Sequence, residues 1–208
     1  VPSIIMQSIS SVMTFGMNKI LIGFSETAVA VFGVYFKLQS FIFMPIFGLN
    51  NGMIPIVAYN YGARSKKRIM ETVWLSIGIA VGIMLIGLMV FHLMTPQLLM
   101  LFQADEEMLA IGVPALRIIS LSFLFAGYCI IVGSVFQALG NGVYSLIISV
   151  ARQLVCILPL AWFFARTFGL HAVWLSLPLA EITSVVLSSI LFRKIYLDKI
   201  KPLGQAAA

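Results

Sequence analysis

Apolar and polar positions in this chain alternate on the scale of whole helices, with long apolar stretches separated by short polar loops. A helix needs about 20 predominantly apolar residues to cross a hydrocarbon core of ~30 Å. Each long stretch in the chain reaches that length. The pattern therefore predicts about six transmembrane helices, over residues 2–22, 29–59, 69–94, 108–139, 145–166 and 172–193.

The second and fourth stretches are longer than a single crossing requires. In the second, Pro45 and Pro55 each remove a backbone donor, so we expect the helix to tilt or bend there. The prediction is an all-α, polytopic membrane protein. Residues 1–200 would form one helical bundle and residues 201–208 a short tail.

Small and polar residues inside three of the stretches fall on single helix faces, at about 100° per residue. The lines are Ser3, Gln7, Ser11, Thr14 and Asn18; Lys37, Ser40, Met44, Gly48, Asn51 and Pro55; and Arg117, Ser120 and Tyr128. Faces of this kind contact protein or water rather than lipid. Hydrogen bonds between packed helices would account for the Ser and Thr hydroxyls. They account less well for Lys37 and Arg117.

Composition favours a membrane over water, because 61% of the residues are hydrophobic and 10% are charged. In a soluble protein, the net charge of +6 would suggest nucleic-acid binding. Here the basic residues concentrate in loops between apolar stretches, which is how membrane proteins set their orientation. We therefore expect membrane lipid, and no nucleic acid, as a partner.

Two basic clusters are separated by an even number of crossings, so they lie on one side of the membrane. They consist of Arg64, Lys66, Lys67 and Arg68, and of Arg193, Lys194, Lys199 and Lys201. Short positively charged loops stay in the cytoplasm. Both ends of the chain should therefore be cytoplasmic in a plasma membrane, and the acidic loop Asp105–Glu107 should lie outside.

The chain begins at Val1 with neither an initiator Met nor a basic stretch, so it shows no ordinary secretory signal, and we expect it to be part of a longer protein. Residues 204–208 should be weakly structured. Cys129 and Cys156 both lie within apolar stretches, which favours simple packing over a disulfide or a metal site.

Four ionisable residues lie well inside the predicted spans: Lys37, Arg117, Arg152 and Glu181. Each costs at least ~2.5 kcal/mol in the bilayer centre unless it is paired or faces a cavity. At about 1.5 Å per residue, Arg152 and Glu181 reach a similar depth on consecutive antiparallel helices. An ion pair between them is therefore predicted, with a role either in helix packing or in transport.

Several kinds of site are not supported by the sequence. His92 and His171 have no second His or Cys at ligand spacing, and the sequence has no GxSxG, HExxH or Gly-rich phosphate loop. We therefore predict no enzyme activity, no cofactor and no metal site. Gly78 and Gly82 form a GxxxG pattern, which predicts a close-packed helix face.

Several short motifs occur in the order typical of one transporter family. Residues 43–52 read FMPIFGLNNG and residues 60–64 read NYGAR; Pro2-Ser3 with Asn18, PALRI at 114–118, FQALGN at 136–141, and Arg152-Gln153 with Pro159, Gly169 and Trp174 accompany them. Over residues 1–200 the chain resembles one lobe of the multidrug and toxic compound extrusion (MATE) family.

The resemblance implies a six-helix lobe that faces a second, similar lobe across a central cleft. That cleft would open alternately to each side, exporting drugs as protons or sodium ions enter. Tyr128 lies near the position where sodium-coupled members carry an acidic residue, so we do not expect sodium binding in this lobe. The aspartate common in proton-coupled members belongs to the other lobe, and the first helix here has no acid.

We predict that the chain is the C-terminal lobe of a secondary active multidrug efflux antiporter. It would export amphipathic or cationic compounds in exchange for protons or sodium ions, with the N-terminal lobe and drug-like cations as partners. The predicted cleft residues are Gln7, Lys37, Asn51, Arg117, Tyr128 and Glu181, with Arg152 as charge partner.

Two alternatives remain open at this point. The first is a lipid-linked sugar flippase of the same superfamily, in which Lys37 and Arg117 would bind a pyrophosphate. The second is a membrane scaffold subunit that does not transport.

Overall fold

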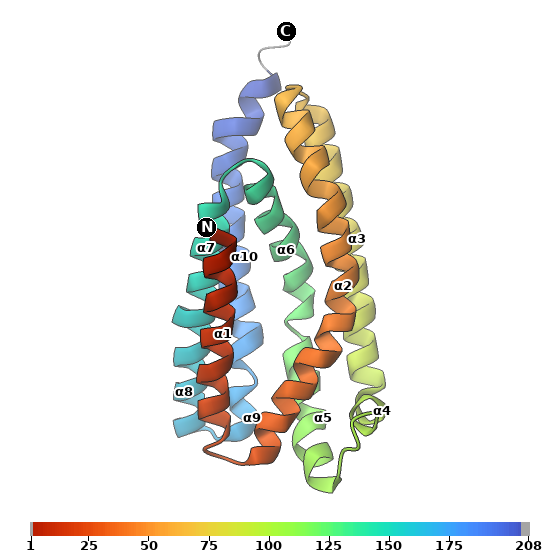
Figure 1. Cartoon of the computed structure of the whole chain (residues 1–208), viewed down its shortest axis with the longest axis vertical. Helices are drawn as coiled ribbons and strands as arrows, with labels where there is room; N and C mark the ends of the chain where they lie inside the picture. Colours follow the sequence, from red (N-terminus) through yellow and green to blue (C-terminus); the bar gives the residue numbers. More distant parts are fainter. Residues whose placement is uncertain (1, 205–208) are drawn as a thin grey trace.

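The computed structural model describes residues 2–204, which fold into an elongated bundle whose helices run along the long axis (Figure 1). The first part of the chain comprises α1 (Pro2–Leu21), α2 (Glu26–Gly62), α3 (Lys66–Leu93) and the short α4 (Thr95–Met100). Next come α5 (Glu106–Ser120) and α6 (Phe123–Ala138), which together make one passage through the bundle.

The last part of the chain makes two further passages. The first joins α7 (Gly142–Val150), the π-helical segment η1 (Ala151–Ile157) and α8 (Leu158–Thr167). The second begins with the single turn α9 (Leu170–Val173) and continues as α10 (Ser176–Ile195), η2 (Tyr196–Ile200) and η3 (Lys201–Gly204). The expected weak structure of residues 205–208 lies outside the described residues.

The fold confirms the predicted all-helical membrane architecture. By length and apolar composition, four helices of the described chain qualify as membrane spans, or five if the bent pair α5 and α6 counts as one. The predicted span 108–139 is therefore broken by a bend of 49°. The helix α1 is not among these candidates, because its polar line lowers its apolar content.

The helix α2 continues through both Pro45 and Pro55 as one segment of 37 residues. Ser25 caps its first turn, because the Ser25 hydroxyl accepts a hydrogen bond from the Ala28 amide at 3.1 Å and so satisfies one free amide of that turn. The helix α5 begins in the same way, with Asp105 accepting from the Met108 amide at 2.8 Å. The loops before α2 and α5 are thereby fixed.

Within the described residues, α3 and α6 share the most extensive helix contact. A methyl group added at Gly127 of α6 would lie 3.1 Å from the main chain of Ala80 on α3, so any larger residue there would have to push the two helices slightly apart. The predicted close-packed face at Gly78 and Gly82 is wrong, because no described atom lies within 4 Å of a methyl group added at either. The interface uses the neighbouring face of α3, which carries the buried Ala80. Gly78 lies off this face and is exposed.

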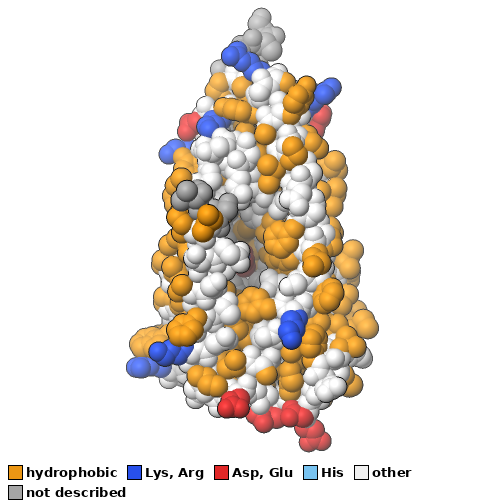
Figure 2. Space-filling view, viewed as in Figure 1, with side chains coloured by type: hydrophobic (Ala, Val, Ile, Leu, Met, Phe, Trp, Pro, Cys, Tyr) orange, Lys and Arg blue, Asp and Glu red, His pale blue; other side chains and the backbone are white. Residues whose placement is uncertain are grey.

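Basic residues gather at the end of the bundle that holds the α2–α3 loop and the end of α10. Lys66 lies 5.4 Å above the Tyr196 ring, and Lys199 donates hydrogen bonds to the Leu139 carbonyl at 2.8 Å and to Asn141 at 2.6 Å. Figure 2 shows blue side chains at the top of the bundle, with red ones close by, and a further group of red side chains at the bottom. The two predicted basic clusters therefore lie at the same end of the bundle.

We predict that single cysteines placed at Ser65 and Lys199 react with an impermeant thiol reagent only from the cytoplasm. A cysteine at Glu106 should react only from outside, because the α4–α5 loop lies at the other end of the bundle (Figure 1). The measurement compares how far the reagent labels each cysteine in intact cells and in inverted membrane vesicles. Reaction of Ser65→Cys and Glu106→Cys from the same side would contradict the orientation.

Candidate functional site

An ion pair joins η1 to α10 in the interior of the bundle. Nη1 of Arg152 donates to Oε1 of Glu181 at 2.6 Å, as the sequence predicted. The Glu181 side chain is 9% exposed, whereas the Arg152 side chain is 32% exposed. The carboxylate is thus the buried member of the pair, and the guanidinium has one side open.

Irregular backbone surrounds this pair. Arg152 and Gln153 lie on the π-helical segment η1, and the break between α5 and α6 exposes Ser122 to the same interior. Such irregularity at membrane depth is tolerated where it lines a cavity or is buried in protein, and it recurs at the binding sites of transporters. The other carboxylate oxygen of Glu181, Oε2, is buried and has no hydrogen-bond partner within residues 2–204.

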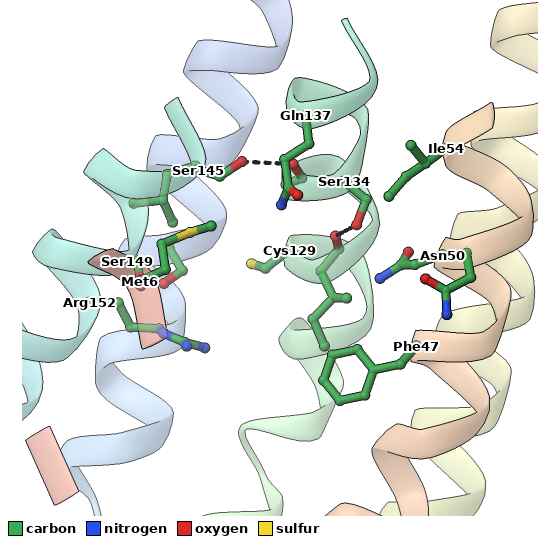
Figure 3. A pocket seen from close by; sticks show the side chains of 15 residues that line it. Met6, Phe47, Asn50, Ile54, Cys129, Ser134, Gln137, Ser145, Ser149 and Arg152 are labelled. Carbon is green, nitrogen blue, oxygen red and sulfur yellow. Dashed lines mark hydrogen bonds between the residues drawn. The ribbon is translucent and has the colours of Figure 1, made fainter. Parts of the chain in front are cut away.

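Two cavities meet at Arg152. The first, which we call the amide cavity, has a volume of about 340 Å³. Its lining contains three side-chain amides, several serines, Cys129 and one guanidinium. Figure 3 shows Arg152 reaching into it from one side, with Asn50 on the opposite side and Gln137 at one end.

The second cavity, which we call the aromatic cavity, has a volume of about 310 Å³. Aromatic rings form much of its wall, and its polar lining includes both members of the ion pair. The aromatic side chains are Tyr35, Phe36, Phe43 and Phe47. Phe47, Ile130 and Arg152 line both cavities, so the ion pair lies at the boundary between them.

The face that carries α1 and α2 is hollowed between these helices (Figure 2). An open groove of about 520 Å³ follows α1 and is lined by Gln7, Ser10, Ser11, Thr14, Phe15, Asn18 and Phe36. Four of the five residues of the predicted polar line of α1 therefore lie in this groove, and the side chain of Ser3 lies outside the described residues. Every residue of the predicted α2 line is exposed.

Most hydroxyls on these faces bond within their own helix. Ser11 and Thr14, for example, donate to the carbonyls of Gln7 and Ser10, one turn earlier. Bonds between helices occur elsewhere, as between Ser145 and the Gly133 carbonyl at 2.7 Å. For Ser11 and Thr14, the expected role of the hydroxyls in bonding neighbouring helices is therefore wrong.

The structure separates the predicted cleft residues into two groups. Asn51 lines the amide cavity, Glu181 the aromatic cavity, Arg152 both, and Gln7 the α1 groove.

Lys37, Arg117 and Tyr128 lie outside these three spaces. Lys37 is exposed near the Phe102 ring, 5.7 Å from its centre, Arg117 is exposed on α5, and the Tyr128 hydroxyl lies 3.0 Å from that of Ser189. A cleft role for these three stays a prediction.

Several cavity residues were not predicted from the sequence. Asn50 and Gln137 line the amide cavity, while Tyr35 and Gln153 line the aromatic cavity. A signal existed for three of them, because Asn50, Gln137 and Gln153 lie within the motifs that resemble the MATE lobe. Tyr35 carries no such signal, since an aromatic residue in an apolar helix is usually a packing residue. No group of metal-binding side chains occurs among the described residues.

Comparison with known proteins shows which family the chain belongs to. The family model described as MatE matches residues 2–163. The chain belongs to the MatE family. Among its MatE relatives, the multidrug export protein MepA of Staphylococcus haemolyticus is 27% identical over 181 residues. MepA of Staphylococcus aureus strain MSSA476 is 27% identical over 184 residues. Both matches cover 87% of this chain and 40% of the relative, so the chain spans less than half of their length.

Solved MATE structures share the fold of this lobe. An outward-facing multidrug resistance MATE transporter matches 98% of this chain and 46% of its own, with a TM-score of 0.88 and 24% identity. The inward-facing conformation of such a transporter matches 100% of this chain and 48% of its own, also with a TM-score of 0.88 and 24% identity. A Pyrococcus furiosus transporter of the MOP superfamily, described as having a binding pocket of reverse polarity, matches at 25% identity with a TM-score of 0.87.

Proposed function

We propose that this chain is the C-terminal lobe of a secondary active multidrug antiporter in the plasma membrane. It acts with a second, similar lobe to export amphipathic or cationic compounds in exchange for protons or sodium ions. The observation that carries the proposal is the hollowed α1–α2 face, with its exposed polar lines and a buried ion pair at the junction of two cavities.

The open face supports a two-lobe arrangement. The faces of α1 and α2 that carry Gln7, Ser11 and Asn51 are unsuited to lipid, because hydrocarbon cannot form hydrogen bonds with their polar groups. A second lobe placed over this face would enclose the groove and both cavities between two bodies. Drug-like cations would reach the cavities through that space.

Rigid-body movement of the lobe is also supported. The lobe matches an outward-facing and an inward-facing transporter equally well, with a TM-score of 0.88 for each. A lobe that keeps its internal fold while the cleft changes sides predicts this result. Alternating access by rocking of two rigid halves around a central site is an established transporter plan.

Among the described lining residues, Glu181 is the one carboxylate in either cavity, so it is the proposed site of ion coupling. The proton or sodium ion would bind at the buried Oε2, which has no hydrogen-bond partner within residues 2–204. The alternative of a pyrophosphate site built from Lys37 and Arg117 gains no support, since both side chains lie outside the cavities. The scaffold alternative leaves the cavities without a role.

Proteoliposomes with an imposed proton gradient test the proposal. A protein that joins this lobe to its second lobe should move a cationic dye such as ethidium, and the 208-residue chain should not, because one lobe supplies half of the cleft. Glu181→Gln should abolish gradient-driven movement, whereas Glu107→Gln in the exposed first turn of α5 should leave it intact. Gradient-driven dye movement by the 208-residue chain as a monomer would refute the proposal.

A further inference from the structure

The amide cavity has an unusual chemical composition for a site in a transporter of cations. Its one charged lining residue among the described residues is Arg152, and it has no carboxylate. The polar groups around the guanidinium are the amides of Asn50, Asn51 and Gln137 and the hydroxyls of Ser134, Ser145, Ser149 and Ser184. A cation in this space would therefore contact a guanidinium and no carboxylate.

Several of these groups are free to bond a ligand. Within residues 2–204, the side chain of Arg152 has one hydrogen bond, from Nη1 to Glu181, so other N–H groups of the guanidinium remain available. Ser149 accepts a bond from Gln153 at 2.8 Å, which leaves its hydroxyl hydrogen free to donate. Asn50 is 7% exposed, and its side-chain amide makes no hydrogen bond within residues 2–204, so its N–H groups are also available to donate.

We propose that the amide cavity binds the anionic group of an amphipathic molecule, such as a carboxylate, sulfonate or phosphate. The planar guanidinium of Arg152 matches such groups, and the amides and the Ser149 hydroxyl donate further hydrogen bonds. Met6, Phe47 and Ile54 provide apolar contacts for the rest of the molecule. A volume of about 340 Å³ lies within the range of small-molecule sites. The inference concerns binding, and it holds whether or not the chain transports.

The ion pair explains why the two cavities differ in charge. Arg152 lines both cavities, whereas Glu181 lines only the aromatic one, where its buried Oε2 lacks a partner within residues 2–204. The carboxylate end and the surrounding rings suit a cation. The guanidinium end, with its amides, suits an anion. One pair thus gives two neighbouring cavities opposite preferences.

Cys129 lines the amide cavity and provides a native reporter of its charge. The test uses the full 208-residue chain with Cys156→Ser, in nanodiscs of zwitterionic lipid. Cys129 is treated with sulfonatoethyl or trimethylammonioethyl methanethiosulfonate, and each rate is divided by the rate of that reagent with free cysteine. The normalised rate should be higher for the sulfonate, by less than the roughly tenfold expected for one unpaired charge in a partly desolvated site, because Glu181 offsets part of the Arg152 charge.

Variants of the pair assign the preference to Arg152. Glu181→Gln should increase the preference for the sulfonate, because the guanidinium loses its counter-charge. Arg152→Gln should reverse the preference, and Arg152→Gln with Glu181→Gln should bring the ratio near one while avoiding an unpaired buried charge. As a positional control, Ser11→Cys in a chain without Cys129 and Cys156 should show a ratio near one, because no charged residue among those described lines its groove.

Protection of Cys129 from the neutral reagent N-ethylmaleimide identifies the ligand class. Hexanesulfonate should protect, and hexyltrimethylammonium of equal chain length should not. Protection by phosphatidylglycerol in the nanodisc, without added hexanesulfonate, would identify a lipid headgroup as the source of the anion. Equal protection by the two hexyl compounds, faster reaction with the cationic reagent, or a sulfonate preference that survives Arg152→Gln would overturn the proposal.

Discussion

Replacing Arg152 by Gln is expected to lower the free energy of unfolding by about 3–5 kcal/mol, the cost of leaving one member of a buried pair without its partner. Glu181 is the member left behind, and its side chain is 9% exposed. Glu181→Gln should cost less, because the Arg152 side chain is 32% exposed and its free side faces a cavity. The order of the two losses therefore follows from burial.

The double variant separates pairing from general damage. With both charges replaced by amides, the loss should be smaller than the sum of the single losses by at least about 0.5 kcal/mol, because neither charge is left buried without a partner. Unfolding in mixed micelles measures all three variants. Arg117→Gln, on the exposed face of α5, is the matched control and should change little. Additive losses for Arg152 and Glu181 would show that the pair does not contribute to folding.

Replacing Trp174 by Ala is expected to cost about 3–5 kcal/mol, because the ring is fully buried and its removal leaves a large cavity. Trp174 follows the single turn α9, and its ring centre lies 6.3 Å from that of Phe32 on α2. The residue therefore packs the connection before α10 against the core. Loss of the ring would also loosen the start of the helix that carries Glu181.

Two further variants test this assignment to packing. Within residues 2–204 the Trp174 Nε1 has no hydrogen-bond partner, so Trp174→Phe removes an unpaired donor and keeps an aromatic ring. It should cost far less than Trp174→Ala. Trp74→Ala, at a position that is 58% exposed on α3, should also cost little. Thermal unfolding of the three variants in one detergent measures the order, and an equal loss for Trp74→Ala would contradict a packing role specific to Trp174.

Helix content, membrane class and the joint position of the two basic clusters were predictable from the sequence. They depend on run length, composition and parity, which are properties of consecutive residues. The pairing of Arg152 with Glu181 was predictable for a similar reason, since both lie at similar depth on consecutive antiparallel helices. Tertiary structure confirmed that pair at 2.6 Å.

Other parts of the site were beyond a helix-by-helix interpretation. Lys37 and Arg117 fall on predicted polar lines, yet the structure places them outside both cavities, because a helix face does not reveal which neighbour covers it. The bend of 49° between α5 and α6 has no proline at the break to announce it. Gly127 likewise approaches Ala80 through a contact between distant segments, while the local GxxxG pattern at Gly78 faces outward.

The sequence by itself determined that this chain is a bundle of membrane helices with its two basic clusters at one end and an ion pair in its interior. Only tertiary structure decided that Arg152 lies between two cavities, one lined by aromatic rings and a carboxylate and one by amides. The physical reason is that apolar periodicity fixes how each helix meets lipid. The chemistry of a cavity, in contrast, depends on residues such as Asn50, Gln137 and Ser149, which only the packing of α2, α6 and α7 brings together.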